Sequence, residues 1–309
     1  MPDNPELFTC LVYTGTPFMS LTLRCESLVC ELKPELGGCI AGLWSDGIAV
    51  LQSTPADQLQ SVRQAGSYPL VPYSNRIAQA LLHWQGQAYS LVKNWQPDPH
   101  SIHGVGWERP WAVVAQDPAS AQLVYRHAGD ASWPFAFEAT QSISLGADAL
   151  SMTMDIRNLE NHAVPAGLGW HPFFAKRPGA RVVFDATGRW EAGADLLPTH
   201  RLATSGLDVP VADLVVDHCF DGWSGEVQLS DAALSIRIHS SLRHLVVYTL
   251  PSRPDIAIEP VSHVNNAMGQ WPGGSQDLAS LGVVTLQPGA QFSCAMRIDI
   301  QHLGQERRE

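Results

Sequence analysis

The sequence FAFEATQSISLGADALSMTMDI, residues 135–156, decides the fold class. Apolar side chains take mainly the odd positions of 135–145 and the even positions of 150–156. Alternation with a period of two residues is typical of a strand that is buried on one face and solvated on the other. The residues Gly-Ala-Asp at 146–148 lie between the two runs, so the stretch predicts an antiparallel hairpin.

The same pattern returns along the chain. Residues 234–238 and 292–300 also alternate, and four shorter runs are apolar enough to be strands buried on both faces: 111–114, 181–184, 245–250 and 256–258. Gly and Pro fall mostly between these runs, as turn residues do. Residues 58–64 and 275–281 are at best short helices. We therefore expect an all-β fold, a large antiparallel β-sandwich with a concave sheet face able to hold a polar ligand.

Length and charge restrict the organisation and the partners. The chain has 309 residues, of which 45% are hydrophobic, and no linker, repeat or low-complexity segment divides it. This predicts one domain over residues 1–309. The formal net charge of −11 argues against a nucleic-acid surface, which needs clustered cations, and against an anionic membrane surface. A small neutral molecule fits that charge as a partner, and the sequence does not define an oligomeric state.

The ends of the chain and its cysteines predict the compartment. The N-terminal residues 1–18 have neither a basic region nor a long apolar one, so we expect no signal peptide, and no run reaches the length of a membrane span. No CxxC pair occurs, and most of the cysteines lie on apolar faces of strand-like runs. We expect reduced, buried thiols in a cytoplasmic protein. The cysteines are Cys10, Cys25, Cys30, Cys39, Cys219 and Cys294.

Two segments in the first half of the chain carry polar groups that a core would not choose. In YPLVPYSNRI, residues 68–77, Arg76 follows Asn75, and its fixed fork of donors can bind two ligand oxygens at once or else pin a loop. In SIHGVGW, residues 101–107, glycines on either side of Val105 let the backbone approach a ligand around His103. Trp107 can stack on a ligand or belong to the core.

Two later segments carry an imidazole and a carboxylate. In GLGWHPFF, residues 167–174, burial would lower the pKa of His171, whereas a nearby carboxylate would raise it. In IAIEP, residues 256–260, Glu259 ends an apolar strand, so desolvation should raise its pKa unless an Arg or His partner holds it charged. Either state suits a general base. The alternatives are an ordinary packed His and an edge Glu that turns into solvent where Pro260 marks the strand end.

The sequence predicts no cofactor. No HxxxH or HxH pair and no Cys at ligand spacing indicates a metal site, although His103, His171 and an acid could still converge in space. Neither a GxGxxG nor a GxxxxGK[ST] stretch supports a nucleotide, and no GxSxG elbow supports a serine hydrolase.

Taken together and in this order, the motifs resemble those of the aldose 1-epimerase (galactose mutarotase) family. The resemblance covers roughly residues 20–300 and includes the early stretch LKPELGG at 32–38. Each motif alone is weak, but the ordered set is specific. The set comprises PLVPYSNRI (69–77), HG (103–104), GWHPFF (169–174), DHCF (217–220) and IEP (258–260).

This resemblance implies a β-supersandwich and a mutarotase mechanism. It makes Glu259 the base and His171 the acid, with His103 hydrogen-bonding near the ring oxygen of the sugar. It also assigns Arg76 and Asp217 to the sugar hydroxyls, although Asp217 by itself reads as a loop residue. Asn75 and Trp107, from the same motifs, complete the expected substrate-binding set.

Two stretches depart from the best-known members of the family. Val105 stands where those members have a second Gly after His-Gly, and residues 260–263, PVSH, are more like a shorter bacterial branch. The resemblance therefore does not define which sugar is bound.

The chemistry of mutarotation fits the residues independently. One proton leaves the anomeric hydroxyl and one reaches the ring oxygen, which a carboxylate and an imidazole can do without a metal or a redox step. Three alternatives stay open. A hexose-6-phosphate 1-epimerase would need extra cations, a glycoside hydrolase could use Asp217 and Glu259, and a non-catalytic carbohydrate-binding protein would use neither.

Overall fold

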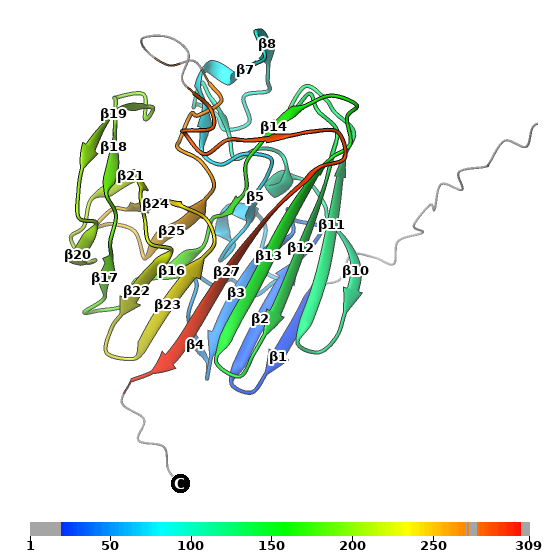
Figure 1. The fold of residues 1–309 in the computed structure, drawn as a ribbon. Helices are drawn as coiled ribbons and strands as arrows, with labels where there is room; N and C mark the ends of the chain where they lie inside the picture. Colours follow the sequence, from blue (N-terminus) through cyan, green and yellow to red (C-terminus); the bar gives the residue numbers. More distant parts are fainter. Residues whose placement is uncertain (1–19, 270, 272–276, 304–309) are drawn as a thin grey trace, which may run out of the picture.

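The largest unit of the computed structural model, which describes residues 20–269, 271 and 277–303, is an antiparallel sheet of nine strands. Figure 1 shows this sheet running from β10 at the right to β20 at the left. The predicted hairpin is confirmed, with Leu145 opposite Leu150. In spatial order the strands are β10 (Ala112–Gln116), β11 (Ser120–His127), β12 (Phe137–Leu145), β13 (Ala149–Asn158), β27 (Gln291–His302), β23 (Leu234–Ser240), β22 (Glu226–Ser230), β17 (Arg181–Phe184) and β20 (Leu207–Pro210).

A second antiparallel sheet, of eight strands, carries the later motifs. Its central strands β24 and β25 are buried almost throughout, as the apolar runs at 245–250 and 256–258 predict. The strands are β19 (Pro198–Ala203), β18 (Gly188–Ala192), β21 (Val216–Asp221), β24 (His244–Thr249), β25 (Asp255–Val261), β15 (Gly169–Trp170), β5 (Pro69–Leu70) and β16 (Phe173–Ala175), of which β16 pairs with β25.

Smaller elements complete the described residues. The four-stranded sheet β1–β4 and three two-stranded pairs, β14 with β26, β6 with β9 and β7 with β8, accompany three single turns of 3₁₀ helix. Their bounds are β1 (Leu21–Cys25), β2 (Leu28–Lys33), β3 (Cys39–Ser45), β4 (Ile48–Ala49), β6 (Arg76–Ile77), β7 (Leu81–Trp84), β8 (Gln87–Ser90), β9 (Ser101–Ile102), β14 (Val164–Ala166), β26 (Val284–Leu286), η1 (Val62–Gln64), η2 (Ala78–Ala80) and η3 (Gly106–Glu108).

The eight-stranded sheet is buried on both faces, and each face belongs to a different apolar cluster. On one face Phe220, Val247 and Ile258 join the large core shared with the nine-stranded sheet. Burying each of these side chains contributes about 1.5–3 kcal/mol. On the other face Cys219 and Val246 belong to a smaller cluster around Tyr68, Trp107 and Phe173. The candidate site lies on this second face.

Two predicted strands are less buried than expected. Strand β10 is an edge strand, so Val114 is 42% exposed, and the burial expected of residues 111–114 is wrong except at Trp111. In β17 burial alternates because one face of the nine-stranded sheet is solvated. Pro260 does not end its strand, since β25 continues to Val261.

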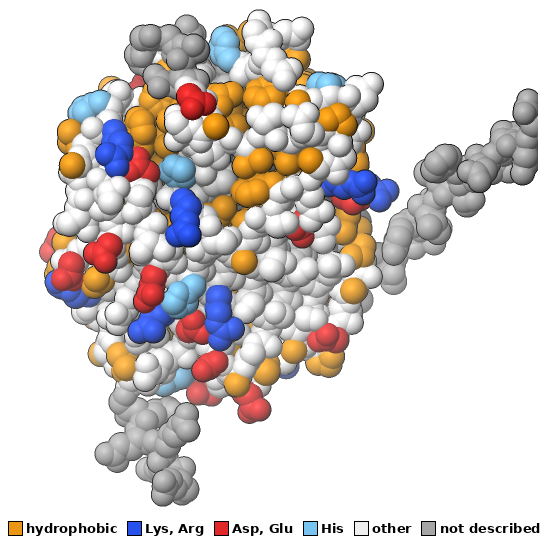
Figure 2. All heavy atoms as spheres, viewed as in Figure 1, with side chains coloured by type: hydrophobic (Ala, Val, Ile, Leu, Met, Phe, Trp, Pro, Cys, Tyr) orange, Lys and Arg blue, Asp and Glu red, His pale blue; other side chains and the backbone are white. Residues whose placement is uncertain are grey.

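The two segments that the sequence offers as short helices at best form single turns where the structure describes them. Only the 3₁₀ turn η1 forms within residues 58–64. Of residues 275–281, positions 275 and 276 lie outside the described residues, and the described remainder forms turns. Over the part of the chain that the structure describes, no helix has the length and hydropathy needed to cross a membrane. On the face seen in Figure 2, acidic and basic side chains intermingle, and no continuous basic patch is visible.

Candidate active site

Strand register brings two carboxylates to one face of the eight-stranded sheet. Cys219, Val246 and Glu259 lie opposite one another across β21, β24 and β25. Asp217 lies two residues before Cys219 and so points to the same face. Glu259 and Asp217 are therefore two strand spacings apart and offset by two residues along the strands, ~12 Å between backbones, with their side chains on the same side of the sheet. That interval suits a ligand the size of one sugar ring.

Glu259 and His171 form a direct, buried contact. Nε2 of His171 lies 3.2 Å from Oε1 of Glu259, and the two side chains are 8% and 3% exposed. The second carboxyl oxygen, Oε2, and the other ring nitrogen, Nδ1 of His171, are buried without a hydrogen-bond partner among the described residues. Buried polar atoms without partners are costly. The pair therefore retains unused hydrogen-bonding capacity in the site.

Local packing fixes the ring of His171. Its backbone N–H donates to the carbonyl of Tyr68 at 3.0 Å. The ring stacks on Phe173 with centroids 4.3 Å apart and lies 4.8 Å from the ring of Tyr68. The imidazole of His171 is therefore packed against two aromatic rings, one from its own segment and one from residues 68–77.

Burial controls the proton affinity of the pair. Desolvation, with a smaller effect of Asp217, raises the pKa of Glu259 well above its ordinary value, and Arg76 only partly opposes it. Desolvation lowers the pKa of His171 to about 3. Both shifts favour neutral groups, so the pair holds one proton over a wide pH range. Of the two outcomes open for Glu259 from sequence, a raised pKa is the one found.

His103 is held as a hydrogen-bond donor. The ring Nδ1 of His103 accepts the backbone N–H of Asn75 at 3.1 Å, and the backbone N–H of His103 donates to the carbonyl of Asn75 at 2.9 Å. A ring whose Nδ1 accepts a hydrogen bond carries its proton on Nε2. The ring centroid lies 5.2 Å from that of His171, and burial, followed by His171 and Arg76, lowers the pKa of His103 well below its ordinary value.

Arg76 and Asn75 are held by their surroundings. Nε of Arg76 donates to Oδ2 of Asp98 at 2.9 Å, and Oδ1 of Asn75 accepts the backbone N–H of Arg76. Both Asn75 and His103 have a positive φ, of 54° and 62°, which is uncommon outside glycine and clusters at functional sites. Burial raises the pKa of Asp217, while Arg76 and His218 lower it. Arg76 is thus electrostatically coupled to both carboxylates.

Aromatic side chains form the remaining wall. Trp107 is 2% exposed and lies 5.6 Å from Tyr68 and 5.8 Å from Trp95, centroid to centroid. The guanidinium of Arg63 lies 3.4 Å above the ring of Trp95. The ring of Trp107 also lies 6.1 Å from that of His103, and a direct contact with a sugar stays a prediction.

Four residues of this site were not selected from the sequence. Tyr68 and Phe173 lie inside the first and third motifs, where the density of aromatic residues was the available signal. Trp95 and Asp98 lie between motifs in an irregular stretch, and only their contacts in the folded chain identify them.

The described residues show no metal-binding cluster, and their cysteines are unpaired. They contain no group of three or more His, Cys, Asp or Glu side chains placed to hold a metal. Cys25, Cys30, Cys39, Cys219 and Cys294 are free, whereas Cys10 lies outside the described residues.

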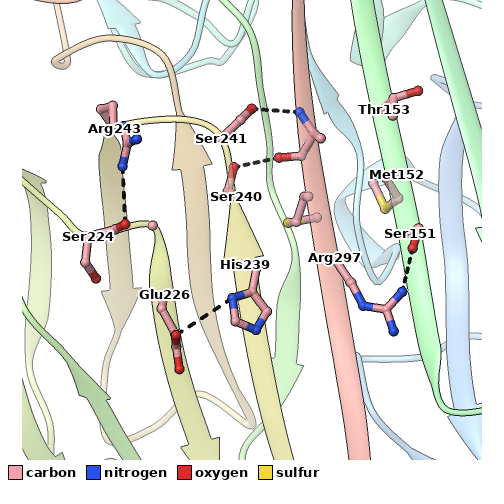
Figure 3. Close-up of a pocket in the computed structure, with 13 residues that line it drawn as sticks. Ser151, Met152, Thr153, Ser224, Glu226, His239, Ser240, Ser241, Arg243 and Arg297 are labelled. Carbon is pink, nitrogen blue, oxygen red and sulfur yellow. Dashed lines mark hydrogen bonds and ion pairs between the residues drawn. The ribbon is translucent and has the colours of Figure 1, made fainter.

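A separate surface pocket lies on the outer side of the nine-stranded sheet (Figure 3). Its polar groups are engaged with one another: Glu226 with His239, Arg297 with Ser151 and Arg243 with a backbone carbonyl. None of the polar atoms that line it is among the buried atoms without partners in the described chain. We therefore take the face with Glu259 as the candidate site.

Comparisons with known proteins agree with this geometry. The sequence profile of the aldose 1-epimerase family matches residues 22–279. The uncharacterized Escherichia coli K12 protein YphB is 27% identical over 299 residues, covering 91% of this chain and 99% of its own. A second uncharacterized protein of that strain, YihR, is 27% identical over 215 residues, covering 64% of this chain and 70% of its own.

Solved structures share the fold. An E. coli K12 protein provisionally assigned as an aldose 1-epimerase superposes with a TM-score of 0.81 at 26% identity, covering 92% of this chain and 99% of its own. A galactose mutarotase-like protein from Clostridium acetobutylicum superposes with a TM-score of 0.79 at 20% identity, covering 92% and 95%, and shows the fold alone.

The antiparallel β-sandwich is the fold that these solved aldose 1-epimerase-like and galactose mutarotase-like structures share. The chain belongs to the aldose 1-epimerase family.

Proposed function

We propose that this protein is a mutarotase that interconverts the α and β anomers of a free aldose. The observation that carries the proposal is the 3.2 Å contact between His171 and Glu259, with Oε2 of Glu259 buried and unpartnered. A hemiacetal presents a hydroxyl and a ring oxygen on one carbon, so two adjacent proton-transfer groups match it. Asp217, across the sheet, is the candidate acceptor for the hydroxyls at the far side of the ring.

Ring opening requires that one proton leaves the sugar and that another proton reaches it. The step starts from the form of the pair that carries its one proton on His171. Glu259 takes the proton of the anomeric hydroxyl while His171 gives its proton to the ring oxygen, and the C–O bond of the ring breaks to leave an aldehyde. Rotation about the adjacent C–C bond presents the other face, and both transfers then reverse. The proton count of the pair is the same before and after, which fits a buried pair that holds one proton.

His103 and Arg76 orient the sugar in this mechanism. With its Nδ1 engaged by Asn75, His103 offers Nε2–H as a fixed donor to the ring oxygen. Arg76, anchored to Asp98 through Nε, has the rest of its fork for hydroxyl oxygens. Fixed donors reduce the entropy lost on reaching the reactive geometry.

The alternatives find less support at this site. A phosphosugar needs several cations for its phosphate. Arg253 is bound to Asp255 at 2.6 Å and Arg76 shares its fork with Asp98, so of these site cations in the described chain Arg63, over Trp95, is the one outside an ion pair. A glycoside hydrolase would leave the contact between His171 and Glu259 without a role. A binding protein would have no need to bury a carboxyl oxygen without a partner.

Polarimetry tests the proposal. Freshly dissolved α-anomers of neutral aldoses, a uronic acid and a hexose 6-phosphate are followed with and without the protein. We expect faster equilibration of at least one neutral aldose, abolished by Glu259→Gln. No acceleration of any free aldose, or acceleration only of the phosphosugar, would contradict the proposal.

A further inference from the structure

His263 is a buried histidine that the mechanism above does not use. It lies two residues beyond the end of β25 and is 1% exposed. Its Nδ1 lies 2.8 Å from the carbonyl oxygen of Val264, and its Nε2 lies 3.2 Å from the backbone nitrogen of Ser74. Because a carbonyl only accepts and an amide only donates, Nδ1 carries the proton and Nε2 accepts.

The hydrogen bond to Ser74 leads directly to the catalytic face. Ser74 and Asn75 are neighbours in the loop between β5 and β6. The N–H of Ser74 ends on the ring of His263, and the N–H of Asn75 ends on the ring of His103. Two successive backbone N–H groups of one loop thus donate to two imidazoles. His103 lies beside the reacting pair, whereas His263 lies away from it. A shift of the loop at Ser74 would move the amide that sets the tautomer of His103.

Close packing leaves the ring of His263 no other position. A Cβ on Gly167 would lie 2.2 Å from Cδ2 of His263 and 2.5 Å from its Nε2. The N–H of Gly167 also donates to the carbonyl of Pro72 at 2.7 Å, in the same loop. The ring therefore fills the space between the backbone at Gly167 and the loop.

One other titratable side chain approaches His263. His244 donates Nδ1–H to the carbonyl of Ser262 at 2.9 Å and lowers the pKa of His263, although burial is the larger cause. The ring of His244 makes no hydrogen bond to the loop of Ser74 among those described, so it provides a matched control.

We propose that His263 is a positioning residue for the reaction, holding Ser74 so that the amide of Asn75 keeps His103 as an Nε2–H donor. The inference rests on the proposed function for its kinetic consequence, but the state of His103 can be observed without turnover. Partners that orient metal-bound histidines typically change activity by about 10–100-fold when removed, and we expect an effect of the same order for the orientation of His103.

Two substitutions separate this role from simple packing. His263→Gln keeps an oxygen near the place of Nε2, within reach of the N–H of Ser74. His263→Asn keeps a polar group at the place of Nδ1 but cannot reach Ser74. Ring ¹⁵N NMR of His103 is recorded with kcat and KM for both variants, the wild type and His244→Gln.

We expect the Nε2–H tautomer of His103 in the wild type, His263→Gln and His244→Gln, with kcat within about threefold. In His263→Asn we expect mixed tautomers of His103 and a kcat lower by about 10-fold or more. An unchanged His103 spectrum in His263→Asn, or equal losses in both His263 variants, would overturn the inference. So would an Nδ1–H tautomer in the wild type, even if His263→Asn does not fold. Failure of every sugar to react refutes the proposed function instead and leaves the NMR result meaningful.

Discussion

Replacing Glu259 by Gln should abolish catalysis and at the same time stabilise the fold at neutral pH. Gln keeps the shape but cannot accept a proton, and removal of a general base costs about 10²–10⁴ in rate, or roughly 2.7–5.5 kcal/mol of barrier. The carboxyl is 2% exposed, and burial raises its pKa. Its protonated form is therefore the one that the folded state favours.

The sign of the stability effect follows from that shift. Protonated Glu259 makes its full contribution to the free energy of unfolding below the unfolded pKa of about 4.3. As pH rises toward the raised pKa of the folded state, this contribution falls by about 1.4 kcal/mol per pH unit. Glu259→Gln has no such loss. The difference in Tm between variant and wild type should thus grow by roughly 2–4 °C per pH unit above about pH 4.3.

Calorimetry from pH 4 to 8, with polarimetry on the same samples, measures both effects. His171→Asn serves as the companion variant, because it removes the partner and leaves the carboxyl buried. Parallel Tm curves for Glu259→Gln and wild type would refute the burial argument. A wild-type rate in Glu259→Gln would refute its role as the base.

The same site leads to four other outcomes. His171→Asn should lower kcat/KM by about 10²-fold or more, whereas His103→Asn, which removes one hydrogen-bond donor, should cost about tenfold; the reverse order in polarimetry would exchange their roles. The pKa of His171 is lowered to about 3 and that of Glu259 is raised, so the plot of kcat/KM against pH should show no acid limb above about pH 4. The rate should fall only at higher pH, where the pair loses its shared proton. An acid limb near pH 6 would contradict this. The pKa of His263 is lowered to about 4, so the wild type should lose about 2 kcal/mol by pH 5 through this group, and His263→Gln should flatten that part of the plot of Tm against pH. EDTA should leave the rate unchanged, since ring opening needs no Lewis acid; loss of activity restored by a divalent ion would overturn the mechanism.

Patterns of period two and continuous apolar runs predicted much of the fold because burial follows both directly. The hairpin of β12 and β13 and the buried strands β24 and β25 could be read from side-chain type alone. The burial of β10 could not, because an apolar run does not reveal whether a strand lies at a sheet edge. From the sequence, Pro260 could also mark the end of its strand, but β25 continues past it to Val261.

The site was predictable where a polar residue interrupts an apolar run. Glu259 and His171 are such residues, although their contact joins positions 88 apart and needed the folded chain. Asp217 came only from the family resemblance, because the register that turns it toward Glu259 is not visible locally. Asp98 and His263 act through hydrogen bonds to backbone or to another side chain, and no sequence pattern marks such contacts.

The place of β27 bears on how the protein is made. It follows every other described strand in the chain, yet it lies between β13 and β23 in the middle of the nine-stranded sheet. During synthesis the two halves of this sheet therefore each have an open edge of unpaired amides until residues 291–302 emerge. One half is β10–β13 and the other is β23, β22, β17 and β20. A nascent chain halted before that point exposes two unpaired strand edges that can pair with other chains. We therefore expect ribosome-bound intermediates to depend on chaperones, and we expect truncated products to aggregate.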